Sequence, residues 1–496
     1  MSISKRARTF LGNPEELARF FWALALLTLP VTSFRYFPFL GDSTQVRPLA
    51  LYPLLPLMVI LLLRFLRREI PKPFPGSLIL LGVFVLVLIL STILGPLYAP
   101  LELRGQDYWG RALRALVTII IGLIFFIAAI WMNRDEEDLR FSIKWLLLGL
   151  CLHIIWASVQ AFSFYTSYLP RPILVDMQLS FSIRVPVKNE RFSALAYEPS
   201  WLAGQIATVY MPWLFAALLT RYRLSRFKWV EPLLFLLTVV LLVMTFSRGG
   251  ILYTLIAAGI TALIVGREQL QHAREWFLAP FGKSHIALNS HGKDFAVRLI
   301  LIVLVLAIVT GAGTLMTQQA YFSKLFSGLE RAETLEEYIV YNYAGARAAY
   351  AIAAMGAYRD HPWLGVGMGA SGFYIYDNLP DWSRTTLFDV ARQLDPNSRQ
   401  YPNPKSMYVR LFAETGLIGF VLFLAFQFSL LADVRRILHS GRARFLGIAA
   451  MFTWIALILY NATQDSFATP NLWINLGIML GLARTLISDE EGRELS

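Results

Sequence analysis

The chain has 496 residues, of which 56% are hydrophobic and only 16% are charged. A soluble domain usually carries about 25% charged residues, so this composition excludes a soluble globular protein and indicates a surface largely covered by lipid. The formal net charge of +12 leaves three explanations open: membrane topology, anionic lipid or an anionic substrate. The single cysteine, Cys151, excludes an intramolecular disulfide framework.

The first predicted helix begins at Asn13-Pro14, with Glu15 and Glu16 at its positive dipole end. No small-residue cleavage site ends the apolar run that follows, so we expect a membrane helix and no cleavable signal peptide. Several later apolar stretches approach the roughly 20 residues that a spanning helix needs, which predicts an all-α integral membrane protein with about 12 transmembrane helices. The predicted spans are 17–34, 49–66, 76–95, 113–132, 142–163, 199–219, 231–246, 249–266, 298–316, 411–432, 446–463 and 470–488.

Basic residues set the predicted orientation, because cytoplasmic loops are rich in Lys and Arg. Lys5, Arg6 and Arg8 place the N-terminus in the cytoplasm. Both termini are then cytoplasmic, and the inner loops are all basic. These loops are 64–68, 221–228, 267–298 and 435–444.

Two large loops fall on the outer side in this topology, at about 164–198 and 317–410. The second has helical patterns and a Gly-rich stretch at 365–369, and structureless loops of this length are rare unless they are functional. The Gly-rich stretch follows a proline and no strand, which excludes a nucleotide-binding loop. The chain therefore divides into helices 1–9 (residues 1–316), a partly helical loop domain between helices 9 and 10 (317–410), and helices 10–12 with a cytoplasmic tail (411–496).

Basic residues also gather on the outer side, where the positive-inside rule expects few. They are Arg171, Arg184, Lys188 and Arg191 in the first loop, Arg248 in the turn between two spans, and Lys324, Arg331, Arg347, Arg359, Arg384, Arg392, Arg399, Lys405 and Arg410 in or beside the second. A solvated surface with acidic neighbours explains any single loop arginine equally well. Arg248 differs, because ionisable groups at the membrane boundary between hydrophobic helices are functional by default.

Helix starts reinforce this pattern. Predicted helices begin after Arg248, at Glu198-Pro199-Ser200 and near Arg410, each with its N-terminus on the outer face. Unpaired N–H groups at helix N-termini suit phosphate, and arginine binds phosphate in a bidentate fork. The natural ligand to expect is a pyrophosphate at the outer edge of the bilayer.

Several motifs occur together in one order. They are RFSALAYEPS at 191–200, TFSRGG at 245–250, GAR at 345–347, DHPWLGVGMG at 360–369 and YVRLFAETGLIG at 408–419. With the long outer loop before the tenth helix, the chain resembles the O-antigen ligase and O-antigen polymerase superfamily, most strongly over about 190–420.

This resemblance implies a metal-independent, inverting C-type glycosyltransferase without a cofactor, located at the periplasmic face of the bacterial inner membrane. Its implied partners are an undecaprenyl-diphosphate-linked glycan as donor, a lipid or glycan acceptor, and membrane lipids, with no nucleic acid. Arg191, Arg248 and Arg347 match arginines expected near the diphosphate or the acceptor sugar. Ligases of this family move a finished glycan to lipid A core or to protein, whereas polymerases join repeat units of O-antigen or exopolysaccharide.

The ligases carry His-(Asn/Ser/Gln), nine residues and Gly-x-x-Gly. In this sequence Gly416 and Gly419 align and Ser406 fills the second position, but Lys405 replaces the histidine. Lysine is a poor base unless burial or nearby cations favour its neutral form, so Lys405 either acts as the base in place of the histidine or binds phosphate. This departure favours a polymerase, with the ligase as the alternative.

Four further positions complete the expected site. Glu198 is expected to orient Arg191, to accept a proton, or to be only a first-turn acid. His361 is expected either to replace the missing base or to pack before Pro362. Arg410 and Ser406 are expected to bind the diphosphate or glycan. The scattered histidines and the lack of an outer Asp-x-Asp motif predict no metal.

Two other classes remain open. A transporter, including a lipid-linked oligosaccharide flippase, fits a dozen helices, although transporters usually show repeated halves with a midplane site. A non-catalytic scaffold that binds acidic glycan predicts small, salt-sensitive effects when one arginine is lost.

Overall fold

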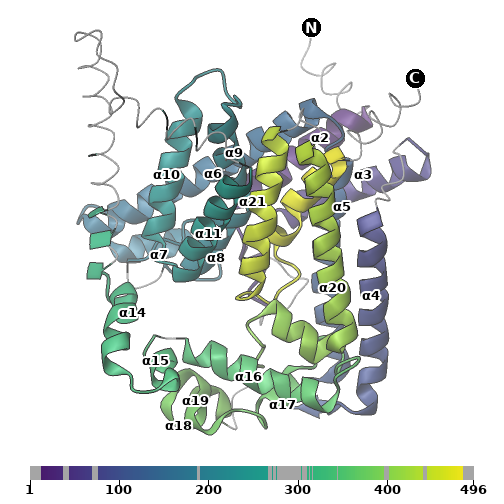
Figure 1. Cartoon of the computed structure of the whole chain (residues 1–496), viewed down its shortest axis with the longest axis vertical. Coiled ribbons are helices and arrows are strands. Elements are labelled where there is room, and N and C mark those ends of the chain that lie inside the picture. The colour runs from purple at the N-terminus through teal and green to yellow at the C-terminus, as the bar shows by residue number, and fades with distance from the viewer. Residues whose placement is uncertain are drawn as a thin grey trace.

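The computed structural model describes residues 13–36, 44–69, 76–186, 190–265, 317–342, 344–395, 401–439 and 444–483, with isolated positions between 271 and 314. This part is mostly helical, and six helices are long and apolar enough to cross a membrane (Figure 1). They are Gly76–Leu97, Tyr108–Trp131, Glu136–Tyr165, Pro199–Thr220, Met407–Leu438 and Arg444–Asn461. Four shorter apolar helices accompany them: Leu51–Leu66, Val230–Met244, Arg248–Ile264 and Pro470–Ala483. The architecture is that of a multi-pass membrane protein, as the sequence predicts.

Most predicted spans correspond to helices of this bundle. The span 298–316 lies mostly outside the described residues, so the total of about 12 spans stays a prediction. The bundle helices are α2 (Pro14–Thr28), α3 (Leu51–Leu66), α4 (Gly76–Leu94), α5 (Tyr108–Trp131), α6 (Glu136–Tyr165), α8 (Pro199–Gln205), α9 (Met211–Thr220), α10 (Val230–Met244), α11 (Arg248–Ile264), α20 (Met407–His439) and α21 (Arg444–Asn461). The main neighbours are α4 with α20, α11 with α21, and α2 with both α3 and α6.

Helix α2 is shorter than its predicted span. The Asn13 side chain caps its start by accepting a hydrogen bond from the Glu15 N–H (3.1 Å). Pro30 follows its last turn, and the chain then runs extended, with Ser33 bridged to Arg47. The segment that completes the predicted span is therefore a connector on the outer side of the predicted topology.

The centre of the bundle is a nearly continuous helix from Pro199 to Thr220, and it is the most deeply buried of the long spans. Its middle turn, η3 (Ile206–Tyr210), is π-helical. The Asn475 side-chain amide donates to the carbonyls of Thr208 (2.8 Å) and Val209 (3.1 Å). A π turn frees backbone carbonyls, and a freed group inside a membrane needs a partner, which Asn475 supplies.

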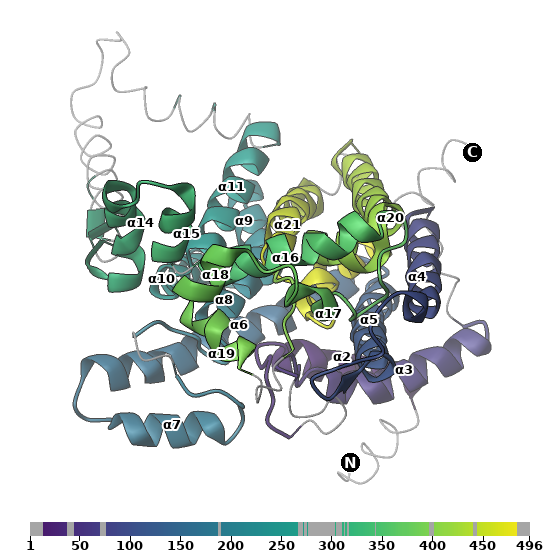
Figure 2. The same ribbon diagram turned by 90° about the horizontal axis from the view of Figure 1, so that it is seen from below.

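A layer of short helices lies below the bundle in Figure 1 and covers the ends of its helices in the view from below (Figure 2). Its helices are α14 (Ala320–Arg331), α15 (Leu335–Tyr341), α16 (Gly345–Asp360), α17 (Gly372–Ile375), α18 (Asp381–Thr386) and α19 (Phe388–Leu394). A separate apolar cluster, including Ala353, Val366 and Phe373, joins this layer to Tyr108 and Ala112 of α5. We call the described residues between 320 and 405, which form this layer of short helices and their connections, the outer layer.

Smaller elements connect the parts. They are the 3₁₀ turns η2 (Gly95–Leu97) and η5 (Pro470–Leu472), the helix α7 (Arg171–Leu179), and the strands β1 (Glu102–Leu103) and β2 (Gln106–Asp107). The two strands pair antiparallel across a turn at Arg104 and Gly105, both with positive φ. The described fold is thus not purely helical, because this short hairpin joins α4 to α5. Two-residue strands carry no alternating pattern that sequence inspection could detect.

The tenth helix differs from its predicted start at 411. Helix α20 begins at Met407 and breaks at Gly416, whose backbone (φ 62°, ψ −166°) is not helical. The outer layer fills the break: the Val366 N–H donates to the Ala413 carbonyl (3.0 Å), and the Leu417 N–H donates to the Pro362 carbonyl (2.8 Å). A Cβ at Gly416 would lie 2.3 Å from the Trp363 carbonyl carbon, so only glycine allows this approach.

Candidate functional site

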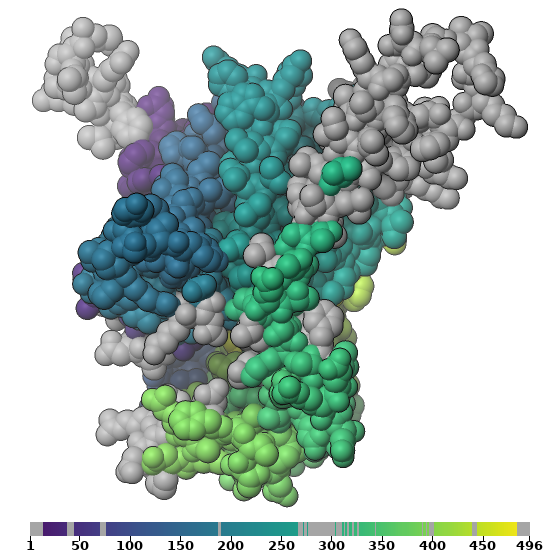
Figure 3. All heavy atoms as spheres, turned by 90° about the vertical axis from the view of Figure 1, so that its left-hand side faces the viewer, coloured from purple at the N-terminus to yellow at the C-terminus, as the bar shows by residue number. Residues whose placement is uncertain are grey.

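A cavity of about 970 Å³ lies where the bundle meets the outer layer. Its lining comes from α5, the start of α8, the start of α11, the start of α20, the loop after α21, and residues 369–371 and 401–405 of the outer layer. In the space-filling view, the outer layer lies along the lower edge of the molecule, with a recess between it and the α7 segment (Figure 3). Bundle and outer layer together therefore form the cavity.

Basic side chains dominate this cavity. They are Arg111, Arg114, Arg184, Arg191, Arg248, Arg347, Lys405 and Arg410. The acidic lining residues are Glu198, Glu414 and Asp465. Among the described residues, only two ion pairs involve cavity side chains, Arg184–Glu198 (3.3 Å) and Arg410–Glu414 (2.8 Å). A positive excess in a partly enclosed space attracts an anion.

The three arginines expected near the diphosphate all line the cavity. Arg191 Nε donates to the Thr245 carbonyl (3.0 Å), Arg248 Nη1 to the Asn342 carbonyl (3.1 Å), and Arg347 Nη1 to the Thr463 carbonyl (2.8 Å). Each guanidinium is thus oriented by backbone oxygen. Neutral carbonyls fix the direction of an arginine without neutralising its charge, which suits anion binding.

Local sequence places Arg248 at the cavity. Phe246 turns the chain with φ 46° after α10, and the Ser247 side chain caps α11 by accepting from the Gly250 N–H (3.4 Å). Arg248 is consequently the first residue of α11, one residue before the predicted span. A Cβ at Gly250 would lie 2.3 Å from the Ala203 Cβ, so this glycine lets α11 approach α8 closely.

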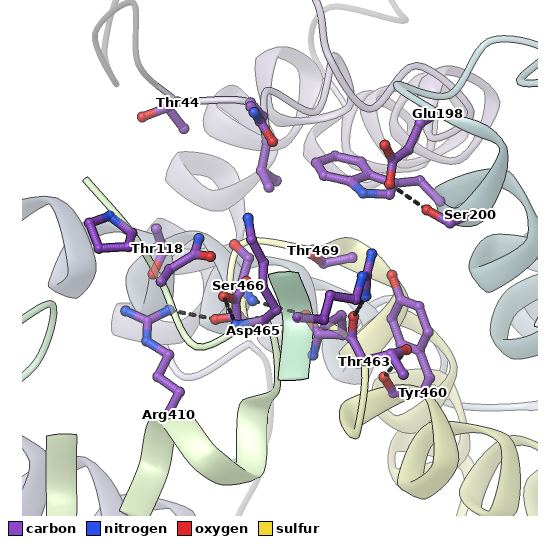
Figure 4. A pocket seen from close by; sticks show the side chains of 18 of the residues that line it. Thr44, Thr118, Glu198, Ser200, Arg410, Tyr460, Thr463, Asp465, Ser466 and Thr469 are labelled. Carbon is purple, nitrogen blue, oxygen red and sulfur yellow. Dashed lines mark hydrogen bonds between the residues drawn. The ribbon is translucent and has the colours of Figure 1, made fainter. Parts of the chain in front are cut away.

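Glu198 also lines the cavity, immediately before α8. It pairs with Arg184 and accepts a hydrogen bond from the Ser200 hydroxyl. Arg184 also lies over the Tyr197 ring, 4.6 Å from its centroid. The sequence suggested that Glu198 orients Arg191, whereas in the structure Glu198 forms its ion pair with Arg184. Figure 4 shows Glu198 and Ser200 on one side of the cavity, and Arg410 with Asp465 on the other.

Lys405 and Arg410 converge on the loop at 463–466, between α21 and η5. The Lys405 backbone N–H donates to an Asp465 carboxylate oxygen (3.0 Å). Arg410 Nη1 donates to the Asp465 carbonyl (2.5 Å), and Figure 4 shows these two residues side by side. Arg347 contacts the same loop at Thr463. Ser406 is buried and is not among the lining residues.

Two features keep Glu414 from acting as a free base. One of its oxygens accepts from Arg410 Nε (2.8 Å), and the other accepts from the Ser371 hydroxyl (2.7 Å). Its side chain is almost fully buried. Glu414 therefore joins Arg410 to the outer layer.

His361 is not among the lining residues of the cavity. It directly follows α16, and its ring stacks on the Tyr98 ring with 4.3 Å between centroids. This arrangement matches packing in the turn before Pro362, the second of the two interpretations of the sequence.

Sequence reasoning missed Arg111, Arg114 and the loop at 463–466. Both arginines lie in the first two turns of α5, which begins on the same side as α8 and α11. Arg111 and Arg114 flank the start of the predicted span at 113, so they are charged residues at a membrane boundary, as Arg248 is, and the same rule would have predicted a functional role for them. Asp465 had no such signal, since an acid in a short loop between two spans is ordinary.

Comparison with protein families gives one match. Residues 233–424 match the Wzy_C family, described as O-antigen ligase. The matched region includes α10, α11, the outer layer and the start of α20. No curated protein matches the chain. No group of three metal-ligating side chains occurs within the described ranges, and metal independence stays a prediction.

Proposed function

We propose, from the match of residues 233–424 to the O-antigen ligase family, whose members are membrane enzymes that transfer glycans, that this chain polymerises lipid-linked repeat units. The donor is an undecaprenyl-diphosphate-linked saccharide, and the reaction takes place at the periplasmic face of a bacterial inner membrane. The observation that carries this proposal is the basic cavity of about 970 Å³ between bundle and outer layer.

The donor diphosphate lies against Arg191, Arg248 and Arg347. Their guanidinium groups line the cavity and are oriented there by the backbone carbonyls of Thr245, Asn342 and Thr463. Negative charge on the diphosphate grows as the glycosidic bond breaks. Preorganised cations stabilise that charge more in the transition state than in the ground state, which accelerates the reaction.

In the proposed reaction, an acceptor hydroxyl oxygen attacks the anomeric carbon of the donor from the face opposite the diphosphate. The new C–O bond forms as the bond to the phosphate oxygen breaks, and undecaprenyl diphosphate leaves with the electron pair. The hydroxyl proton passes to Glu198, which is hydrogen-bonded like Glu414 but keeps 23% of its side chain exposed, against 2% for Glu414. Diphosphate is a good leaving group, so a weak base suffices.

Lys405 acts in this scheme as a cation beside the leaving group. Its ammonium forms no ion pair within the described residues, and it lines the cavity. A protonated lysine is a suitable phosphate ligand and a poor base. The replacement of the family histidine therefore moves base function away from this position, to Glu198.

The test uses the purified full chain in nanodiscs with an undecaprenyl-diphosphate-linked repeat unit, with and without a lipid A core acceptor. Products are resolved by size. A ladder from the lipid-linked unit alone supports the polymerase. A single shift of the lipid A core acceptor, with no ladder, supports the ligase instead. The same chain is also reconstituted into sealed vesicles, where movement of intact donor across the membrane without any product contradicts the transferase.

A further inference from the structure

A second set of cations lines the cavity on its α5 side. Arg111 and Arg114 project from the first two turns of α5, and Tyr401 lies beside them. We call these three residues the α5 wall. Arg191, Arg248 and Arg347 form the α11 wall.

The side chains of the α5 wall are held in place by contacts with one another and with the backbone. The Arg111 guanidinium lies 3.8 Å from the centroid of the Tyr401 ring, and its Nε is buried without a hydrogen-bond partner in the described structure. Burial raises the pKa of Tyr401, so its hydroxyl stays protonated and donates to the Gly369 carbonyl (3.0 Å). Arg114 is oriented by the Gly110 carbonyl (2.9 Å) and Gln106 (3.0 Å). Both arginines are thereby held at the cavity surface.

Neither arginine of the α5 wall forms an ion pair with a described residue. A half-buried guanidinium without a carboxylate is costly, and an anionic ligand offsets that cost. Backbone carbonyls and an amide orient the two side chains without neutralising them. The α5 wall is therefore suited to binding an anion.

The two walls lie towards different sides of the cavity. Thr118, one turn after Arg114 in α5, lies on the same side as Arg410 in Figure 4. Thr463 lies on the other side of that view, and it accepts hydrogen bonds from Arg347 and from Tyr253 of α11. Two anions can therefore be held without competing for one set of cations.

We propose that the α5 wall binds a phosphoryl group of the acceptor, so that both substrates of the reaction are anionic glycolipids. This inference rests on the proposed function, which assigns the donor diphosphate to the α11 wall. An acceptor anchored through phosphate presents its hydroxyl in a fixed orientation, and such positioning lowers the entropic part of the barrier. A second lipid-linked repeat unit and a phosphorylated lipid A core share this chemistry.

The test measures binding stoichiometry, which does not depend on turnover. Undecaprenyl diphosphate is titrated into the full chain in phosphatidylcholine nanodiscs, for the wild type, the double variant Arg111→Gln/Arg114→Gln, and Arg248→Gln. We expect two sites in the wild type and one in each variant, with at least about tenfold weaker binding at the altered site. Arg359→Gln, at an exposed arginine of α16, is the matched control and keeps both sites.

The outcomes separate this inference from the proposed function. A single site that Arg248→Gln removes and the α5 variant leaves intact overturns the inference and retains the donor site. Two sites that the α5 variant leaves intact also overturn it. No binding by the wild type overturns both. Thermal unfolding of each variant shows whether a lost site reflects a lost fold.

Displacement then distinguishes the two sources of phosphate. In Arg248→Gln only the α5 wall remains, and bound undecaprenyl diphosphate is displaced with an undecaprenyl-diphosphate-linked glycan or with lipid A. Stronger displacement by the lipid-linked glycan supports a second repeat unit as acceptor. Stronger displacement by lipid A supports a phosphorylated core. Failure of both compounds overturns the inference.

Discussion

The Lys405 backbone N–H donates to the Asp465 carboxylate across 3.0 Å, and Lys405 has a left-handed backbone (φ 59°). Two residues far apart in sequence thus hold one turn at the edge of the cavity. A non-glycine residue in this conformation is normally unfavourable, so the contact with Asp465 stabilises the turn. The position of the Lys405 ammonium depends on a residue in another loop.

This contact makes Asp465 a positioning residue. We expect Asp465→Ala to lower kcat/KM roughly tenfold or more, because this hydrogen bond is partly buried and a hydrogen bond to a charged group contributes about 1.5–3 kcal/mol. Asp465→Asn keeps an acceptor for the Lys405 N–H and should retain most activity. Steady-state kinetics of the glycan transfer check both variants. Equal losses in the two would show that the charge of Asp465 acts directly, and positioning would be the wrong explanation.

Arg248 is the arginine on which the proposed reaction depends most. Arg248→Ala should lower kcat by about 10² to 10³, the usual effect of removing one preorganised donor from developing negative charge. Arg359→Ala, at an exposed position of α16, serves as the control and should be near wild type. Product formation and thermal unfolding are measured together. Full activity of Arg248→Ala would refute the proposed role, and a small, salt-sensitive loss would favour a scaffold.

Variants of Lys405 distinguish two roles for this residue, a cation that binds phosphate and a base that accepts a proton. Lys405→Arg keeps a positive charge but cannot deprotonate, so we expect activity within about tenfold of wild type if the residue binds phosphate. The activity of Lys405→Ala should be roughly tenfold lower than that of Lys405→Arg. The pH dependence of kcat provides the second measurement, and Lys405→Arg should leave its shape unchanged. Loss of all activity in Lys405→Arg would point to proton transfer by Lys405.

A substitution at Gly416 tests whether the break in α20 requires glycine. Gly416→Ala introduces a Cβ at a positive φ and against the Trp363 carbonyl, which should destabilise the fold by about 1–3 kcal/mol. Gly82→Ala is the control, because a Cβ at Gly82 meets no atom within 4 Å and the site is in the interior of α4. Thermal unfolding in detergent compares the two. Equal melting temperatures would mean that the break tolerates a side chain.

Sequence patterns predicted the bundle well and the cavity partly. Hydropathy predicted most spans because a membrane helix needs a long apolar run. Arg248, which lines the cavity, was predicted as a site residue because a charged side chain at the membrane boundary is unusual. The junction at Gly416 was not predicted, since a helix break that is filled by another segment depends on tertiary contacts. For the same reason, the sequence could not show that Arg184 contacts Glu198, or that His361 packs on Tyr98.

The break at Gly416 also has a mechanical consequence. Both sides of the break in α20 are hydrogen-bonded to the outer layer, Ala413 to Val366 and Leu417 to Pro362, and the turn that carries Arg410 lies directly before these contacts. Lifting the outer layer away from the bundle would therefore carry Arg410 with it. An open cavity would lose positive charge just as it becomes accessible, and closure would restore that charge around whatever has entered. Admission of a substrate and the strength of the field that acts on it would be linked in a single movement.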